Sequence, residues 1–292
     1  MTRPAPARPD PESGVVLINV LVILALTSSV VMAMISLSDL SITRSQRFSE
    51  AGQALALIAA GETSAIVTLR RDMELASPSD STNEPWAALA QEPVRITGGS
   101  FALQIEDAQA RFNLQNLTSG GVPAAQILRR IVEAEGLPAP VADRIIALMA
   151  KPDQPEWIAD LVAQAAISPD ELIQLSPLIT LLPERTDINI NTAPAPVLSA
   201  LCENPVQART LLAVRARNGA LTPADLVQAR LVLLPGAGYR SRYFRVTVSV
   251  QIGDTSQSRQ SLLQRRTGRA GEAEVVVIGR DAAAEPSPPP PA

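Results

Sequence analysis

The 292-residue sequence contains no histidine and a single cysteine, Cys202. The absence of histidine excludes Ser-His and Cys-His nucleophile pairs, histidine general bases and most zinc sites. One cysteine also excludes an intramolecular disulfide and a cysteine cluster. Cys202 follows the largely apolar run 197–201, and free cysteines are among the most buried residue types, so we expect a small core residue there. Metal sites built from oxygen ligands alone remain open.

Aromatic residues are scarce, at 3%, although 46% of the residues are hydrophobic. The core must therefore consist mainly of Leu, Ile, Val and Ala. The net charge of -4 argues against a general nucleic-acid binder, which usually presents a basic face. No pair of carboxylates suited to acid–base work can be singled out, so an enzyme is the weakest class. The length allows one to two domains with a sizeable core.

Charged residues are missing altogether from Gly14–Ser38. A helix over Val15–Leu37 would be about 34 Å long, enough to cross a hydrocarbon core of ~30 Å. By itself this stretch is equally an ordinary membrane anchor or an uncleaved signal sequence. A short polar leader, Met1–Ser13, precedes it, and four prolines prevent a helix of any length there. Arg3 and Arg8 in this leader favour a cytoplasmic N-terminus and export of the remaining chain.

The helical period continues beyond the apolar run. Apolar residues recur at steps of three and four, and they form one stripe: Phe48, Ala51, Leu55, Ile58, Ile66, Leu69 and Met73. No proline occurs from Val15 to Met73, so we expect one helix of about 90 Å. This stripe is predicted to pack against the folded part and against partner helices.

Strand and helix signals then separate along the chain. Alternating apolar residues predict strands at 101–106 and 244–252, a hairpin partner at 257–266 and a last strand at 274–279. The pattern of residues 105–114 predicts a strand, a turn and a second strand. Between these regions lies a block of short helices, predicted at 123–135, 140–149, 157–166, 169 onward, 196–202, 206–218 and 223 onward. Ser168 and Glu171 form a capping box at the fourth helix.

The fold class is therefore α+β: a long N-terminal transmembrane helix packed on a small antiparallel sheet, with a large all-helical domain inserted between the strands. The sequence predicts a leader at 1–14 and the transmembrane half of the helix at 15–37. The sheet domain has two parts, at 38–121 and 233–280, and the inserted helical domain lies between them at 122–232. A disordered proline-rich tail is predicted at 281–292.

This order of elements resembles a type IV pilin or pseudopilin. Two segments narrow the resemblance to the type II secretion minor pseudopilin family GspK. Phe112-Asn113-Leu114-Gln115-Asn116-Leu117 resembles that family's "FNLNNL" segment. The segment Thr186–Ala193, with Val197-Leu198, resembles its "INVNTA…VL" segment. The similarity spans the chain from Gly14 to about Ile278. The helical insertion resembles SAM and helix-hairpin-helix modules.

The resemblance implies a function and a set of partners. A prepilin peptidase would cleave between Gly14 and Val15. The mature protein would be a single-pass protein of the bacterial inner membrane with its bulk in the periplasm. There it would form the tip of the pseudopilus, help to initiate its assembly, and act without catalysis. The implied partners are the I, J and H type minor pseudopilins, the prepilin peptidase, the inner-membrane secretion platform and membrane lipid, with no nucleic acid.

Asn19 occupies the position at which ordinary pilins carry a glutamate. In ordinary pilins that carboxylate pairs with the N-terminal amine of the neighbouring subunit inside the membrane, where an unpaired charge costs several kcal/mol. GspK proteins typically lack it. A subunit with none ahead of it needs no such carboxylate, so Asn19 is the residue expected of a first subunit.

The resemblance implies calcium as a possible ligand, but the sequence puts it in doubt for this chain. Many relatives have an acidic Asp-Trp-x-Asp-type stretch and a longer loop after the second inserted helix, whereas Met149–Trp157 is shorter and poorer in acid. We therefore assign no metal ligand and no cofactor from the sequence.

One alternative is an anchored DNA-uptake receptor, because an "ININTA" stretch also precedes the DNA-binding hairpin of helix-hairpin-helix modules. Such a hairpin presents backbone N–H groups to phosphate, but here the turn is Cys202-Glu203-Asn204-Pro205. We interpret Asn189, Asn191 and Thr192 as a turn and helix cap. Three arginines that could suit DNA are expected on a solvated face: Arg209, Arg215 and Arg217. A third alternative is an anchored structural protein outside any filament.

Overall fold

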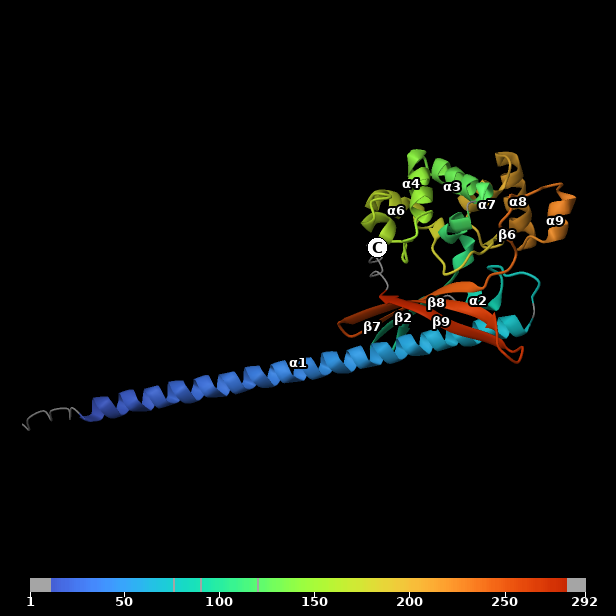
Figure 1. Ribbon diagram of the computed structural model, residues 1–292. Coiled ribbons are helices and arrows are strands. Elements are labelled where there is room, and N and C mark those ends of the chain that lie inside the picture. Colours follow the sequence, from blue (N-terminus) through green and yellow to red (C-terminus); the bar gives the residue numbers. More distant parts are fainter. Residues whose placement is uncertain (1–11, 76, 90, 120, 283–292) are drawn as a thin grey trace, which may run out of the picture.

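The computed structural model describes residues 12–282 except 76, 90 and 120. Figure 1 shows a long helix, a sheet lying along one end of it, and a block of short helices on the other side of the sheet. The helices are α1 (Glu12–Glu74), α2 (Pro85–Ala88), α3 (Val122–Ala134), α4 (Pro140–Met149), α5 (Asp160–Ala163), α6 (Pro169–Leu175), α7 (Ala195–Leu201), α8 (Pro205–Asn218) and α9 (Pro223–Gln228). The strands are β1 (Gln91–Ile96), β2 (Gly99–Asp107), β3 (Phe112–Asn113), β4 (Ile179–Thr180), β5 (Ile188–Asn189), β6 (Ala237–Gly238), β7 (Tyr243–Ile252), β8 (Thr255–Thr267) and β9 (Ala273–Ala282).

Helix α1 is one unbroken helix, as the absence of proline predicts. Its 63 residues span about 94 Å. Every residue from Val15 to Ser49 is exposed, and contact with the rest of the molecule begins at Glu50, whose carboxylate accepts a hydrogen bond from Thr255 Oγ1 at 3.0 Å. The helix begins two residues before Gly14, so the end of the leader is helical, contrary to prediction; residues 1–11 lie outside the described part.

The buried stripe of α1 agrees with the predicted one in part. Ile58, Ile66, Leu69 and Met73 pack in the core under the sheet as predicted, and Ala54 and Ala65 join them. Phe48 and Leu55 are instead 83% and 45% exposed. Phe48 precedes the first contact with the sheet, which explains its exposure. Small residues lie among the large ones in the stripe, and at Gly61 the backbone of α1 comes close to Val248 of β7.

The main sheet is antiparallel, with strand order β1-β2-β7-β8-β9. The sequence prediction that the early and late strands join in one sheet is confirmed, since Phe101 of β2 pairs with Val250 of β7. Strand β1 was missed because Pro93 cannot donate a ladder hydrogen bond, and β1 is accordingly an edge strand with an irregular register.

The alternation of apolar and polar residues along β7 distinguishes the two faces of the sheet. Phe244, Val246, Val248, Val250 and Ile252 are buried against α1, together with Trp86 of α2. Their neighbours along β7 lie on the other face of the sheet, because successive strand residues point to opposite sides. Figure 1 places the helical block on that second side.

The helical block contains short ladders as well as helices, so it is not all-helical as predicted. Strands β3 and β4 form one parallel pair, and β5 and β6 form another. Residues 112–113 therefore pair with β4 and not with the main sheet. The block's core also exceeds the predicted range 122–232, since it includes Phe112, Leu114 and Leu117 and is flanked by Leu233–Tyr239.

Most helix ends agree with the local signals. Ser168 caps α6 through the predicted capping box with Glu171, and Gly219 ends α8 in the left-handed conformation at φ 81°. Helix α5 is shorter than the predicted 157–166, because Asp160 caps the preceding turn and Ala165 takes a positive φ of 54°. At the other end, β9 extends through Ala282, so residues 281–282 belong to the sheet; residues 283–292 lie outside the described part.

Candidate functional site

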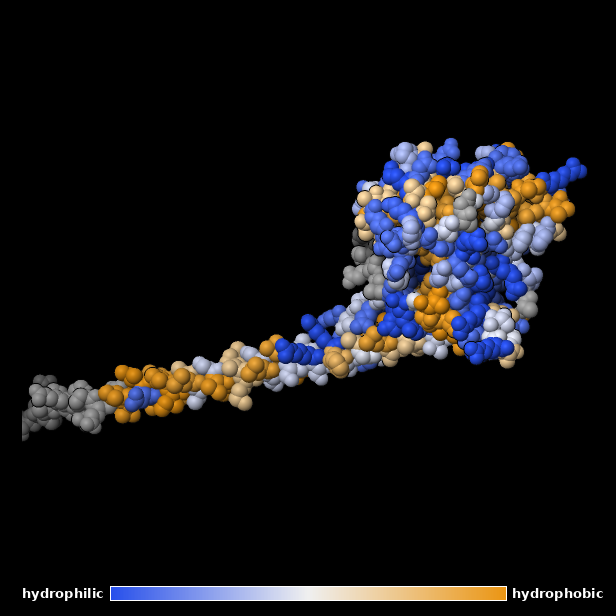
Figure 2. All heavy atoms as spheres, in the orientation of Figure 1, coloured by the Kyte–Doolittle hydropathy of each residue, from blue (hydrophilic) through white to orange (hydrophobic). Residues whose placement is uncertain are grey.

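The N-terminal half of α1 presents a continuous apolar surface. In the described chain, one helix is long and apolar enough to cross a membrane; its most apolar window has a mean hydropathy of 2.6 and no buried residue. Figure 2 shows hydrophobic atoms around this half of α1, which projects away from the folded part. Asn19 is exposed on it, and Gly14 and Val15 lie in its first turns. This surface can enter a bilayer or pack against other helices.

A buried polar cluster joins the helical block to the sheet. We call it the polar junction, and its members are Asp80, Asp107, Asn189, Thr192 and Ser241. The Asp107 carboxylate, at the end of β2, accepts hydrogen bonds from Ser241 Oγ at 2.6 Å, Thr192 Oγ1 at 2.5 Å and Asn189 Nδ2 at 2.9 Å. Burial nevertheless raises the pKa of Asp107 above its usual value.

The same junction reaches the loop after α1. The Asn189 amide also donates to the Asp80 backbone oxygen at 3.0 Å, and Ser241 N–H donates to the Asp80 carboxylate at 2.6 Å. The turn interpretation of this segment is partly right, because Asn191 N–H donates to Asn189 Oδ1. The long-range contacts of Asn189 and Thr192 were missed, since no local pattern identifies the partners of a polar side chain.

The asparagines of the 112–117 segment, like Asn189, hydrogen-bond to residues far away in the sequence. Asn113 Nδ2 donates to Glu184 O at 2.7 Å, and Asn116 both donates to and accepts from the backbone of Thr186, at 2.8 and 3.1 Å. The two segments that carried the family resemblance are therefore parts of one hydrogen-bonded framework. It fixes the chain as it leaves the sheet and as it approaches β5.

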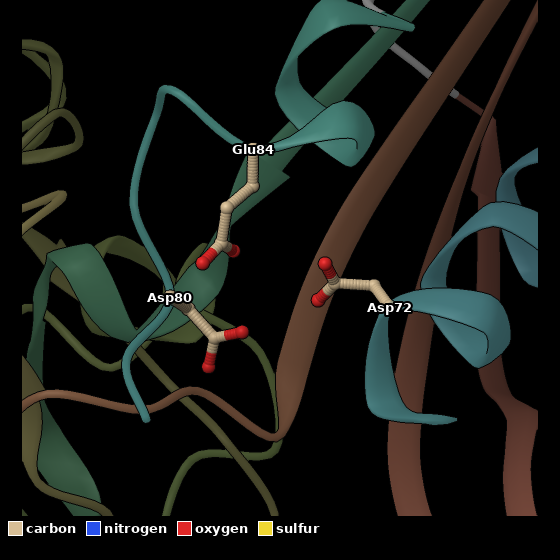
Figure 3. Close-up of side chains that lie close together, drawn as sticks. All are labelled: Asp72, Asp80 and Glu84. Atoms are coloured by element: carbon tan, nitrogen blue, oxygen red, sulfur yellow. The ribbon is translucent and has the colours of Figure 1, made fainter. Parts of the chain in front are cut away.

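A second buried cluster contains three acidic residues, Asp72, Asp80 and Glu84, shown in Figure 3. Within the described residues, this is the group of three acidic side chains close enough to hold a metal ion, with ligand atoms within 4.8 Å of one another. Arg265 donates to Asp72 and to Asp80, each at 2.5 Å, and its guanidinium lies 4.3 Å from the centre of the Phe244 ring.

The remaining carboxylate of this acidic cluster is also hydrogen-bonded. Glu84 accepts from Trp86 Nε1 at 2.8 Å and from Ser77 Oγ at 3.0 Å. Burial raises the pKa of both Asp72 and Glu84, and it outweighs the opposing effect of Arg265 at Asp72. Because Arg265 already supplies the positive charge, the cluster is a structural ion-pair network, and we assign no metal to it.

In the hairpin between α7 and α8, the backbone N–H groups at the start of α8 already have partners within the turn. Asn204 Oδ1 accepts from the N–H groups of Val206 and Gln207, both at 3.0 Å, so the start of α8 is already capped. Cys202 is a buried core residue, as expected, and burial raises the pKa of its thiol to about 11.

The arginines of α8 differ in their exposure and in their contacts. Arg215 is half-buried and donates to the backbone oxygens of Ile190 and Ala193, at 2.8 and 2.7 Å, so its expected place on a solvated face is wrong. Burial lowers its pKa. Arg209 and Arg217 are exposed, in agreement with prediction. Neither the capped turn nor Arg215 offers the contacts that the DNA-uptake alternative needs.

Comparisons with known proteins agree with the fold and the two motif segments. Residues 188–246 match the family model of type II secretion system protein K. The chain is 28% identical over 313 aligned positions to type II secretion system protein K of Pseudomonas aeruginosa, covering 92% of both proteins.

A solved structure shows the same fold. It is one chain of the crystal structure of the GspK-GspI-GspJ complex from the enterotoxigenic Escherichia coli type 2 secretion system, with a TM-score of 0.63 and 19% identity. The match covers 83% of this chain and all of that one. The match to the Pseudomonas aeruginosa protein extends over most of the chain and the solved structure shares its fold, so the chain is similar to type II secretion system protein K.

Proposed function

We propose that this chain is a minor pseudopilin of the type II secretion system, which is stored in the bacterial inner membrane by Val15–Leu37 and later forms the tip of the periplasmic pseudopilus. The observation that carries the proposal is the shape of the molecule. A bare apolar helix projects from one end, and the bulky helical block lies at the other end, over the sheet (Figure 1). The block would stand where a following subunit would have to stack, so the protein would end the filament and help to initiate it.

The orientation in the membrane follows from the leader. Arg3 and Arg8 favour a cytoplasmic N-terminus, which sends the sheet and the helical block to the periplasm as the bulk of a single-pass protein. We assign it a structural role in assembly, with no catalysis, cofactor or nucleic-acid ligand.

The proposed partners are the minor pseudopilins of the I, J and H types, in addition to membrane lipid and the inner-membrane secretion platform. The relative of known structure was solved in a GspK-GspI-GspJ complex. Co-purification of the detergent-solubilised chain with tagged I and J type pseudopilins of the same organism tests the tip assignment. A chain that purifies alone under conditions in which the other two associate would support an anchored protein outside the filament.

Processing by the prepilin peptidase is proposed between Gly14 and Val15, within the first turns of α1. N-terminal sequencing of the membrane-purified protein should give Val15 as the first residue. Gly14→Leu should retain the whole leader, because the peptidase cuts after the glycine, whereas Ser13→Ala should be cleaved normally. An intact leader in the unaltered protein would contradict the pilin-type maturation.

Asn19 would be the fifth residue of the mature chain. We propose that its neutral amide suits a subunit that has none ahead of it, because a carboxylate there would stay unpaired in the membrane. Asn19→Glu should therefore reduce secretion of the system's exoproteins, whereas Asn19→Gln should leave it unchanged. Equal secretion by both variants would contradict this role.

A further inference from the structure

Asn218 is the asparagine that a glycine follows in this sequence. The other asparagines are followed by Val, Glu, Leu, Ile, Thr or Pro. The backbone nitrogen after an asparagine can attack the side-chain amide carbon and close a cyclic imide, and a side chain on the following residue hinders this attack. Glycine has no Cβ, and proline has no N–H to react. The sequence therefore makes Asn218 the asparagine most open to this reaction.

The structure places Asn218 at the end of α8, where it is exposed. Gly219 follows in the left-handed conformation at φ 81°, and its N–H donates to Arg215 O at 2.8 Å. This bond belongs to the last turn of the helix, and helix ends open locally at little cost in free energy. When the bond opens, the Gly219 nitrogen is free to approach Asn218 Cγ.

Two charged neighbours hold the side-chain amide of Asn218. Arg217 Nε donates to Asn218 Oδ1 at 3.2 Å, and Asn218 Nδ2 donates to Asp225 Oδ1 at 3.1 Å. The arginine lies where negative charge develops on Oδ1 during the attack, as a donor in an oxyanion hole does. The aspartate lies beside the nitrogen that has to leave. Both contacts polarise the amide in the direction that the attack requires.

We propose that Asn218 is a site of spontaneous deamidation in the folded chain, with the Gly219 nitrogen as nucleophile and Arg217 as the donor to the developing oxyanion. Gly219 N–H loses its proton to hydroxide, its nitrogen bonds to Asn218 Cγ, and the bond from Cγ to Nδ2 breaks. The leaving nitrogen takes a proton from water and departs as ammonia. Another water molecule then opens the cyclic imide at either carbonyl, which gives aspartate or isoaspartate.

The product would weaken the contacts of the end of α8. A carboxylate at position 218 would face Asp225, to which the amide had donated, and like charges repel at that separation. Isoaspartate also lengthens the backbone before Gly219, whose carbonyl accepts a hydrogen bond from Asn83 Nδ2 at 3.1 Å. Asn83 lies between α1 and α2. Deamidation would thereby loosen the helical block from the segment that follows α1.

Peptide mass spectrometry of the detergent-solubilised full chain, incubated at mildly alkaline pH, tests this proposal. The peptide that contains Asn218 should gain one mass unit, and an isoaspartyl methyltransferase should label part of it. The rate should rise with pH, because the Gly219 nitrogen has to lose its proton. Asn218→Gln should show no gain over the same time, since glutamine would have to close a larger ring.

Two exposed arginines of α8 provide matched variants. Arg217→Gln should slow the mass gain about tenfold, which is less than the loss of a donor from a buried oxyanion hole, because water takes its place here. Arg209→Gln should leave the rate unchanged. In urea, where the contacts of the folded chain are lost, all three chains should react at the same rate. Equal rates of the three folded chains would contradict the role of Arg217.

The unfolded chain also provides the decisive comparison for the site. If Asn218 stays unmodified in the folded chain while the chain in urea gains the mass unit, the hydrogen bond from Gly219 to Arg215 protects the residue and the proposal is wrong. A mass gain that appears in the folded chain at another asparagine first would overturn it as well.

Discussion

Single polar residues connect distant parts of this chain. Asp107 accepts hydrogen bonds from side chains 82, 85 and 134 positions later. Arg265 reaches back 185 and 193 positions, to Asp80 and Asp72. A buried charge is stable only when partners neutralise and hydrogen-bond it. At the scale of residues, these contacts hold α1, the sheet and the helical block in one arrangement.

Two neighbouring arginines allow a matched test of the buried network. Arg265→Met should lower the free energy of unfolding by about 3–5 kcal/mol, because it leaves the Asp72 and Asp80 carboxylates buried without a counter-charge. Arg266→Met removes an exposed ion pair with Glu274 and should cost less than about 1 kcal/mol. Urea unfolding of both variants measures the difference. Equal small losses would mean that Arg265 is dispensable.

Glu62 gives a test in which pH is the variable. Its carboxylate lies on α1 and binds Arg280 at 2.6 Å and Ser261, and Arg280 holds its pKa below the ordinary 4.5. Because the folded pKa is the lower one, the unfolded chain takes up the proton first as pH falls. The stabilisation by Glu62 is therefore present above about pH 4.5 and is lost as pH falls through the folded pKa.

Glu62→Gln should consequently be less stable than the unaltered chain at pH 7, by about 1–2 kcal/mol, since Arg280 is half exposed and partly screened. The gap between the two melting curves should narrow as the pH falls below about 4.5. Asp72 and Asp107 have raised pKa values, so their effect has the opposite sign. That effect is common to both chains, so comparing them at each pH cancels it. A gap that stays constant as the pH falls would exclude the charge as its cause.

At the scale of elements, the contact of α1 with the sheet depends on small residues. Ala54, Ala65 and Gly61 let the helix approach β7 closely. A Cβ at Gly61 would lie 3.0 Å from Val248 Cγ1 and 3.1 Å from Phe101 Cζ. The apolar periodicity alone pointed to larger residues such as Phe48 and Leu55, which the structure leaves exposed.

The two glycines of α1 provide the corresponding prediction. Gly61→Leu should lower stability by about 1–3 kcal/mol, because the new side chain has to displace Val248 or shift the helix. Gly52→Leu should cause no loss, since a Cβ there meets no atom within 4 Å and leucine favours helix more than glycine does. Thermal unfolding compares the pair. A loss at Gly52 as large as that at Gly61 would refute the close-approach argument.

At the scale of the whole molecule, the exposed half of α1 and the helical block lie at opposite ends (Figure 1). The charge-free surface of α1 ends before Asp39, and Phe48 is an exposed aromatic residue beyond it, immediately before the sheet contact begins. In the proposed tip complex, partner helices would cover this part of α1.

Phe48→Ser should therefore weaken co-purification with I and J type pseudopilins, while stability changes by less than about 0.5 kcal/mol, as is usual at an exposed site. Gln53→Ser, also exposed on α1, serves as the control and should co-purify normally. Unchanged association of the Phe48 variant would place the partner surface elsewhere on the molecule.

Features that depend on neighbouring residues could be predicted from the sequence alone. The uncharged run after Gly14, the lack of proline up to Met73, the alternation in 244–252 and the capping box at Ser168 each predicted their element, because hydrophobic period and capping are local properties. The pairing of the early and late strands also followed, since neither region could bury its apolar face alone.

Which polar side chains meet, and how closely the elements approach, became clear only from the folded structure. Asn189 and Thr192 donate to Asp107, and the half-buried Arg215 donates to backbone oxygens. Gly61 is closed in by the sheet, whereas Gly52 is open. These are contacts between residues far apart in the chain, and their energies depend on burial, which no local pattern of residues contains.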